Sequence, residues 1–127
     1  MAGPYPNEQS NLLGAIPVQG LSFFPCGNTI TFTAAATPPA PVQATASVAS
    51  GLISHRILNA GTVLAYLGIG SSATLATTNA GSITTSGPAY PLLPGTDEVI
   101  AAPTNSWFTA STATGTAVLF VTPGMGT

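Results

Sequence analysis

Charged side chains are nearly absent from this sequence. Only Glu8, Arg56, Asp97 and Glu98 carry charge, which is 3% of 127 residues, whereas a typical soluble domain has about 25%. One basic residue cannot neutralise the phosphates of a nucleic acid, so no nucleic-acid partner is predicted. A free monomer usually keeps interspersed charges on its surface. We therefore expect much of this surface to be covered by other protein chains.

Cysteine and long apolar runs are also scarce. Cys26 is the single cysteine, which excludes an intrachain disulfide and a cysteine-based metal cluster. No stretch reaches the roughly 18 to 20 uninterrupted apolar residues that a membrane-spanning helix needs. The opening MAGPYPNEQS has neither the basic nor the apolar region of a secretory signal. We expect synthesis in the cytoplasm and no membrane partner.

Side chains that could perform catalysis are few. A Ser-His-Asp triad could be composed of His55, Asp97 and one of many serines, but no Gly-x-Ser-x-Gly motif is present. A metal site of His55, Asp97 and Glu98 lacks a second histidine and the usual ligand spacing. The sequence therefore predicts neither an enzyme nor a cofactor. It favours His55 and Arg56 as strand residues whose polar ends reach solvent, a backbone carbonyl or a partner chain.

The N-terminal segment, residues 1–28, is predicted to be an extended arm. Proline fixes φ and removes a backbone donor, which disfavours helices and central strands. Four prolines interrupt the segment: Pro4, Pro6, Pro17 and Pro25. Leaving Leu21, Phe23 and Phe24 in water would cost about 1.5 to 3 kcal/mol each. We expect this arm to lie across a surface of its own domain or of a neighbour, with these three residues at an interface. A partly frayed terminus is the alternative.

Residues 29–127 are predicted to form one all-β domain, an antiparallel β-sandwich or jelly roll of about eight short strands. Polar and apolar residues alternate over 29–34 and 42–48, which is the period of a half-buried strand. The alanine-rich stretches are interleaved with Thr, Ser and Val, and these residues favour strands. We expect little or no helix.

The stretch 52–69 is predicted to be the central hairpin. Its two apolar runs, LISHRILN and TVLAYLGI, are joined by Asn59-Ala60-Gly61, where Gly61 could take a left-handed conformation. One face of the first strand has Ile53, His55, Ile57 and Asn59. On the return strand, Leu64 and Tyr66 lie on the face opposite to Val63, Ala65, Leu67 and Ile69. Because both faces are apolar, one is expected to close the sandwich and the other, with Leu64 and Tyr66, to meet a neighbouring subunit.

The remaining chain contains weaker strand signals. Two short strands are expected over 73–77 and 82–85, a type II turn at Pro94-Gly95, a strand over 97–101, and a second hairpin from 106–111 and 116–122. Arg56 is expected to pair with Asp97 or Glu98. Exposed ion pairs contribute only about 0 to 1 kcal/mol, so this pair would help to set the register of the strands more than it would hold the fold together.

Three aromatic residues could stack on sugars: Tyr66, Trp107 and Phe108. They lie within otherwise apolar strands, which favours packing in the core over a carbohydrate site.

From Ser54 onward, the chain resembles small accessory virion proteins of tailed bacteriophages. The resembling pieces are HRILNAGTVLAYLGIG, PLLPGTDEVIAAP and SWFTASTATGTAVLFVTPGMG. The resemblance implies a β-sandwich cement or decoration protein of the phage head. Such a protein is located on the virion, binds the outer capsid surface and stabilises contacts between major capsid subunits. Its partners would be the major capsid protein and copies of itself. A tail, collar or head-fibre component, or a carbohydrate-binding module for host attachment, is the alternative.

Overall fold

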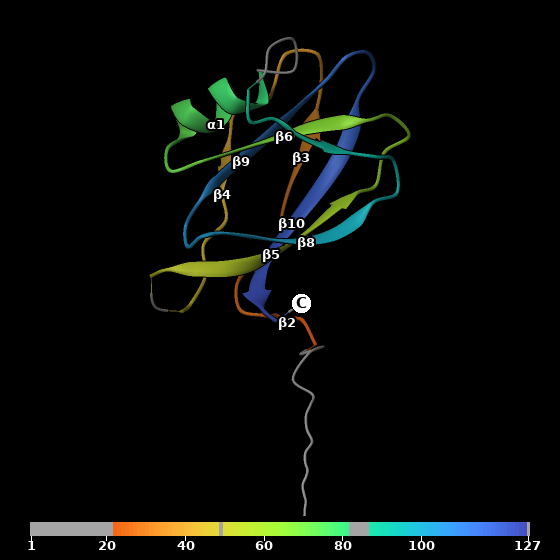
Figure 1. Ribbon diagram of the computed structural model, residues 1–127. Coiled ribbons are helices and arrows are strands. Elements are labelled where there is room, and N and C mark those ends of the chain that lie inside the picture. The colour runs from red at the N-terminus through yellow and green to blue at the C-terminus, as the bar shows by residue number, and fades with distance from the viewer. Residues whose placement is uncertain (1–21, 49, 82–86, 127) are drawn as a thin grey trace, which may run out of the picture.

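Two antiparallel sheets form the domain (Figure 1). The computed structural model describes residues 22–48, 50–81 and 87–126. The five-stranded sheet contains β2 (Phe24–Pro25), β3 (Ile30–Ala34), β5 (Leu52–Asn59), β8 (Asp97–Pro103) and β10 (Ala117–Met125). The four-stranded sheet contains β4 (Val42–Gln43), β6 (Ala65–Gly70), β7 (Tyr90–Leu92) and β9 (Trp107–Thr112). One helix, α1 (Ala73–Ala80), lies outside the sandwich.

The strand order is that of a jelly roll. In the five-stranded sheet, β10 pairs with β5 on one side and with β3 and β2 on the other, and β8 forms the far edge. The other sheet has the order β4-β9-β6-β7. From β3 to β10, the chain changes sheet at every connection except the one between β6 and β7, which is the double Greek-key pattern of a jelly roll. The predicted fold class is confirmed.

The core lies between the two sheets and consists of small and medium apolar side chains. Along β5 the exposed and buried positions alternate. Ile53, His55, Ile57 and Asn59 share one face, as the sequence predicts, and this face points into the core. Phe108 from β9 is the largest fully buried side chain. The cluster is completed by Phe32, Ala34, Ala44, Ala65, Leu67, Leu92, Ala102, Ala110, Ala117, Leu119 and Val121.

The predicted central hairpin over 52–69 is wrong, although both of its strands exist. β5 pairs with β10 and β8, whereas β6 pairs with β9 and β7, so residues 60–64 cross from one sheet to the other. Gly61 is not left-handed. It is needed for space, because a Cβ there would come within 2.6 Å of Ala117. A short Asn-Ala-Gly link suits a hairpin and a crossover equally, and long-range pairing selects the crossover.

The predicted second hairpin is wrong for the same reason. β9 belongs to the four-stranded sheet and β10 to the five-stranded sheet. The link between them turns tightly: Thr112 Oγ1 donates to the Gly115 carbonyl oxygen over 2.7 Å, and Gly115 has a φ of 76°. The turn at Pro94-Gly95 agrees with the prediction. Gly95 has a φ of 76°, and the Thr96 amide donates to the Leu93 carbonyl oxygen over 3.0 Å.

The strand expected over 73–77 is wrong, because α1 occupies this stretch. Ser72 caps its N-terminus by accepting a hydrogen bond from the Leu75 amide over 3.2 Å, and Gly81 follows its last residue. These capping residues were the missed signal. The helix lies on β6 at Gly68 and Gly70, where an added Cβ would overlap helix backbone. The strand expected over 82–85 lies outside the described residues.

The strand predicted over 42–48 is shorter than expected. β4 ends at Gln43, and Ala46 makes only an isolated bridge to Gly27. The described part of the arm also contacts its own domain, since Phe24 and Pro25 pair with Met125 and Gly124 at the end of β10.

Candidate interaction surface

The outer face of the five-stranded sheet carries an ordered row of side chains. The pairing register places Val99 of β8 opposite Arg56 of β5, and Arg56 opposite Thr122 of β10. The row continues to Thr29, whose hydroxyl bonds that of Thr122 over 2.7 Å. These side chains point outward because the inner positions of the same strands form the core.

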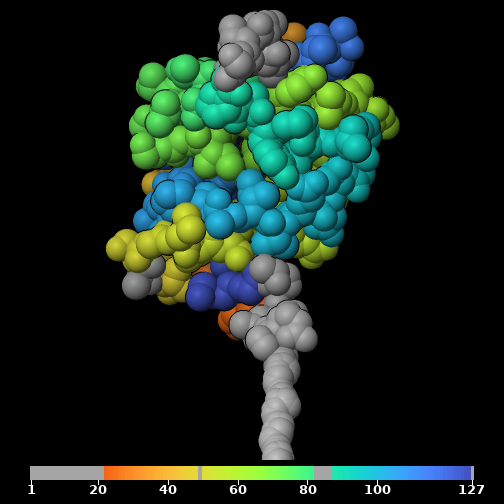
Figure 2. Space-filling model, viewed as in Figure 1, coloured from red at the N-terminus to blue at the C-terminus, as the bar shows by residue number. Residues whose placement is uncertain are grey.

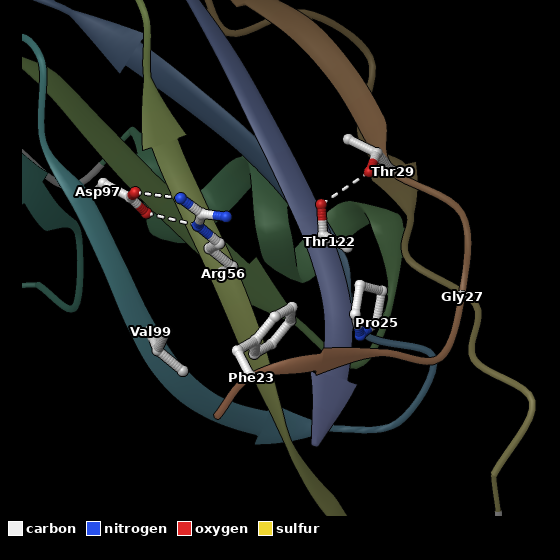
Figure 3. Close-up of a pocket in the computed structure, with 8 residues that line it drawn as sticks. All are labelled: Phe23, Pro25, Gly27, Thr29, Arg56, Asp97, Val99 and Thr122. Atoms are coloured by element: carbon white, nitrogen blue, oxygen red, sulfur yellow. Dashed lines mark hydrogen bonds and ion pairs between the residues drawn. The ribbon is translucent and has the colours of Figure 1, made fainter. Parts of the chain in front are cut away.

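This row forms the floor of a hollow of about 600 Å³ (Figure 3). One wall comes from Phe23 and Pro25, at the point where the N-terminal segment reaches the sheet. A Cβ on Gly124 would overlap the Phe23 ring, so the glycine lets this ring lie on the strand. Among the described residues, the lining is Phe23, Pro25, Gly27, Thr29, Arg56, Asp97, Val99 and Thr122.

An ion pair crosses one side of the hollow. The Arg56 Nε donates to Asp97 Oδ1 over 2.8 Å, and Arg56 Nη2 donates to Asp97 Oδ2. Their hydrogen bonds raise the pKa of Arg56 and lower the pKa of Asp97. The contribution of Asp97 to stability is thus present above its unfolded pKa near 3.8 and is lost as the pH falls through the lower folded pKa. The predicted pairing of Arg56 with Asp97 is confirmed.

Glu98 bonds with Tyr90 and not with Arg56. Its Oε1 accepts a hydrogen bond from the Tyr90 hydroxyl over 2.6 Å, which raises the pKa of Tyr90. Tyr90 lies in β7 and Glu98 in β8, the edge strands of the two sheets. This bond therefore closes one side of the sandwich, where both segments lie together on the surface (cyan, Figure 2).

Charge is confined to a small part of the described surface. Within residues 22–48, 50–81 and 87–126, the charged side chains are Arg56, Asp97 and Glu98. They come from the neighbouring strands β5 and β8. The rest of the described surface therefore presents hydroxyl and amide groups, backbone and apolar side chains.

Exposed apolar side chains gather at the end of the sandwich next to the hollow. Phe24 is 69% exposed, Leu52 70% and Met125 49%. Phe24 lies opposite Met125 in the β2 and β10 pair, and β5 begins at Leu52 beside the same end of β10. We call Phe24, Leu52 and Met125 the apolar end.

Among the described strands, β8 pairs with β5 alone, so its other edge is open to them. The Asn59 amide donates to the Thr96 carbonyl oxygen, and the Thr104 amide donates to the Gly51 carbonyl oxygen, at the two ends of the β5 and β8 ladder. Since backbone direction alternates along an antiparallel strand, Asp97, Val99 and Ala101 turn their N–H and C=O groups away from β5. Such an edge can accept a strand from another chain.

The structure separates the residues predicted to form an interface. Phe23 and Phe24 lie at the hollow and the apolar end, and Leu21 lies outside the described residues. Leu64 and Tyr66 are half-buried, and Tyr66 belongs to β6 of the other sheet. That face is partly covered by α1. Val99, Thr122, Leu52 and Met125 were missed, although outward strand positions beside Arg56 would have indicated the first two.

His55 differs from the prediction, because its polar end does not reach solvent. The side chain is fully buried in the core and lies against Phe108, with ring centroids 5.1 Å apart. Neither ring nitrogen makes a well-formed hydrogen bond, and the interaction with the Ile53 backbone is too weak to offset the effect of burial. Burial lowers the pKa of His55 below 6.5, so the imidazole is neutral in the folded protein at neutral pH. The alternation of β5 places residue 55 inward whatever its polarity.

We expect His55 to make the protein less stable in mild acid. The unfolded chain binds a proton near pH 6.5, whereas the folded chain does so only at lower pH, so stability falls as the pH drops below 6.5. The slope approaches about 1.4 kcal/mol per pH unit until the folded pKa is reached. Urea unfolding at pH 7.5 and pH 5.0 will measure this loss. His55→Phe should remove most of it, and an unchanged loss in this variant would contradict the assignment.

The catalytic and sugar-binding alternatives gain no geometric support from these residues. His55 faces the core and Asp97 faces outward, so a triad containing both is not assembled. Phe108 is fully buried, while α1 lies on the β6 face between Tyr66 and Trp107. No group of His, Cys, Asp and Glu among the described residues could hold a metal ion. None of the helices in the described part of the chain is long and apolar enough to cross a membrane.

Comparisons of the chain with family models, curated proteins and solved structures gave no match.

Proposed function

We propose that this chain is a structural virion protein, a cement or decoration subunit that binds the outer capsid surface of a tailed phage. It would stabilise contacts between major capsid subunits and lie beside copies of itself. The resemblance of the chain from Ser54 onward to phage accessory proteins supports this proposal. A jelly roll is also common among viral capsid domains, although fold alone does not assign function.

The observation that carries the proposal is the distribution of charge. Covering a charged side chain with another protein costs desolvation energy unless a partner is supplied. Here Arg56 and Asp97 already pair with one another, and Glu98 accepts a bond from Tyr90. A neighbouring subunit could therefore cover most of the described surface without leaving an unpaired charge.

The clamping contacts would come from two features. The apolar end exposes Phe24, Leu52 and Met125, and burying each such side chain contributes about 1.5 to 3 kcal/mol. The open edge of β8 would add backbone hydrogen bonds to a strand of a neighbour. Together they would hold adjacent capsid subunits against the pressure of packaged DNA.

Particles from the encoding phage provide the test. We expect cryo-electron microscopy to locate the chain on the outer head surface, with Leu52→Glu lowering its occupancy about tenfold or more. Leu93→Glu is the matched control, because Leu93 is similarly exposed at 67% but lies in the β7 to β8 turn. A chain found only in the tail or collar, or absent from virions, would refute the proposal.

A further inference from the structure

We infer that the hollow on the five-stranded sheet receives the N-terminal segment, residues 1–21, of a second copy of this chain. The inference deepens the proposed self-association and rests on the proposed function only in expecting copies to lie side by side. The inference concerns self-association of the purified chain in solution. It can therefore fail while the chain still binds the phage head, and the chain can self-associate without binding the head.

The hollow offers the chemistry that an extended, proline-containing chain needs. Phe23 and Pro25 provide an apolar wall, and Val99 adds an apolar side chain to the floor. The ion pair uses Nε and Nη2 of Arg56, and the remaining guanidinium nitrogen points over the floor toward Thr122 (Figure 3). Its N–H groups can donate to backbone carbonyl oxygens of an incoming chain. Aromatic walls with a few donors are typical of grooves that bind polyproline segments.

The N-terminal segment has the matching composition. Its single charged side chain is Glu8, and its branched aliphatic side chains are Leu12, Leu13, Ile16, Val18 and Leu21. Proline lacks an N–H group, so such a segment presents carbonyl acceptors in excess of donors. The donors of Arg56 and the apolar lining therefore complement both of its features.

The direction of the chain favours a second copy over the same one. Phe24 lies opposite Met125 and Pro25 opposite Gly124 in an antiparallel pair. At Phe24 the backbone, followed toward the N-terminus, thus runs in the direction of the carboxyl end of β10 and away from Thr122 and Arg56, where the hollow lies. Filling its own hollow would require an immediate reversal. Twenty-one extended residues span at most about 70 Å, which is ample to reach a neighbour.

Sedimentation equilibrium of the full chain tests this inference with two variants. Val99→Arg fills the hollow, and the double variant Leu12→Glu, Leu13→Glu alters the segment. We expect the wild-type chain to self-associate and each variant to associate about tenfold or more weakly. Mixing them should restore association, because the first retains an intact segment and the second an intact hollow. The double variant changes no described residue, so it stays informative even if Val99→Arg does not fold.

Val118→Arg is the matched control. Val118 is 39% exposed, lies on the same face of the sheet and is not part of the hollow. We expect this variant to associate like the wild type. A wild-type chain that stays monomeric, including one whose own segment fills its hollow, would overturn the inference. Equal association of Val99→Arg and Val118→Arg, or a mixture that does not recover, would overturn it as well.

Discussion

Replacing Gly68 with alanine is expected to lower the free energy of unfolding by about 3 kcal/mol. A methyl group at this position would overlap the Ala76 carbonyl oxygen and the Ala80 amide nitrogen, both of which belong to the α1 backbone. A helix backbone cannot rotate aside as a side chain can, so α1 must lift from β6. That movement would also break the bond from Ser111 Oγ to the Ala80 carbonyl oxygen, which is 2.6 Å long.

Urea unfolding of the two proteins will measure this difference. Gly81→Ala is the matched control, because a Cβ at Gly81 would lie 3.5 Å from the nearest atom and its φ is −79°. The control should change stability by less than about 0.5 kcal/mol. An equally small effect of Gly68→Ala would show that α1 does not pack directly against β6.

Asn59→Ala is expected to cost a similar amount, about 3 kcal/mol. The buried side-chain Nδ2 of Asn59 donates to the carbonyl oxygens of Val63 and Leu92 over 3.1 and 3.0 Å. Its Oδ1 accepts a hydrogen bond from the Gly61 backbone amide over 2.9 Å. One side chain therefore holds both the crossover from β5 to β6 and the end of β7. Each buried polar group left without a partner costs about 1 to 3 kcal/mol.

Thermal and urea unfolding will test this role of Asn59. Asn28→Ala is the control, because Asn28 is exposed, and such a change usually alters stability by less than about 0.5 kcal/mol. Asn59→Asp should be at least as damaging as Asn59→Ala, because it removes both donors and places a carboxylate in the core. If Asn59→Ala matched the control, the crossover would not depend on this side chain.

Part of the candidate site was predictable from local residues. The pairing of Arg56 with Asp97 follows from their being the scarce opposite charges. Phe24, which was expected at an interface, is exposed in the single chain. The hollow was not predictable, because Phe23, Val99 and Thr122 are far apart in the chain and meet only through the pairing of β2, β5 and β8 with their neighbours.

The sequence by itself determined the all-β class, which residues of β5 and of β6 share a face, and the scarcity of surface charge. Alternation with a period of two residues encodes each of these faces locally. Only the tertiary structure decided that β5 and β6, and likewise β9 and β10, belong to opposite sheets, that 73–80 is a helix, and that His55 is fully buried. Sheet membership depends on backbone bonds between distant strands, which every residue can make. The alternation of side chains therefore carries no information about it.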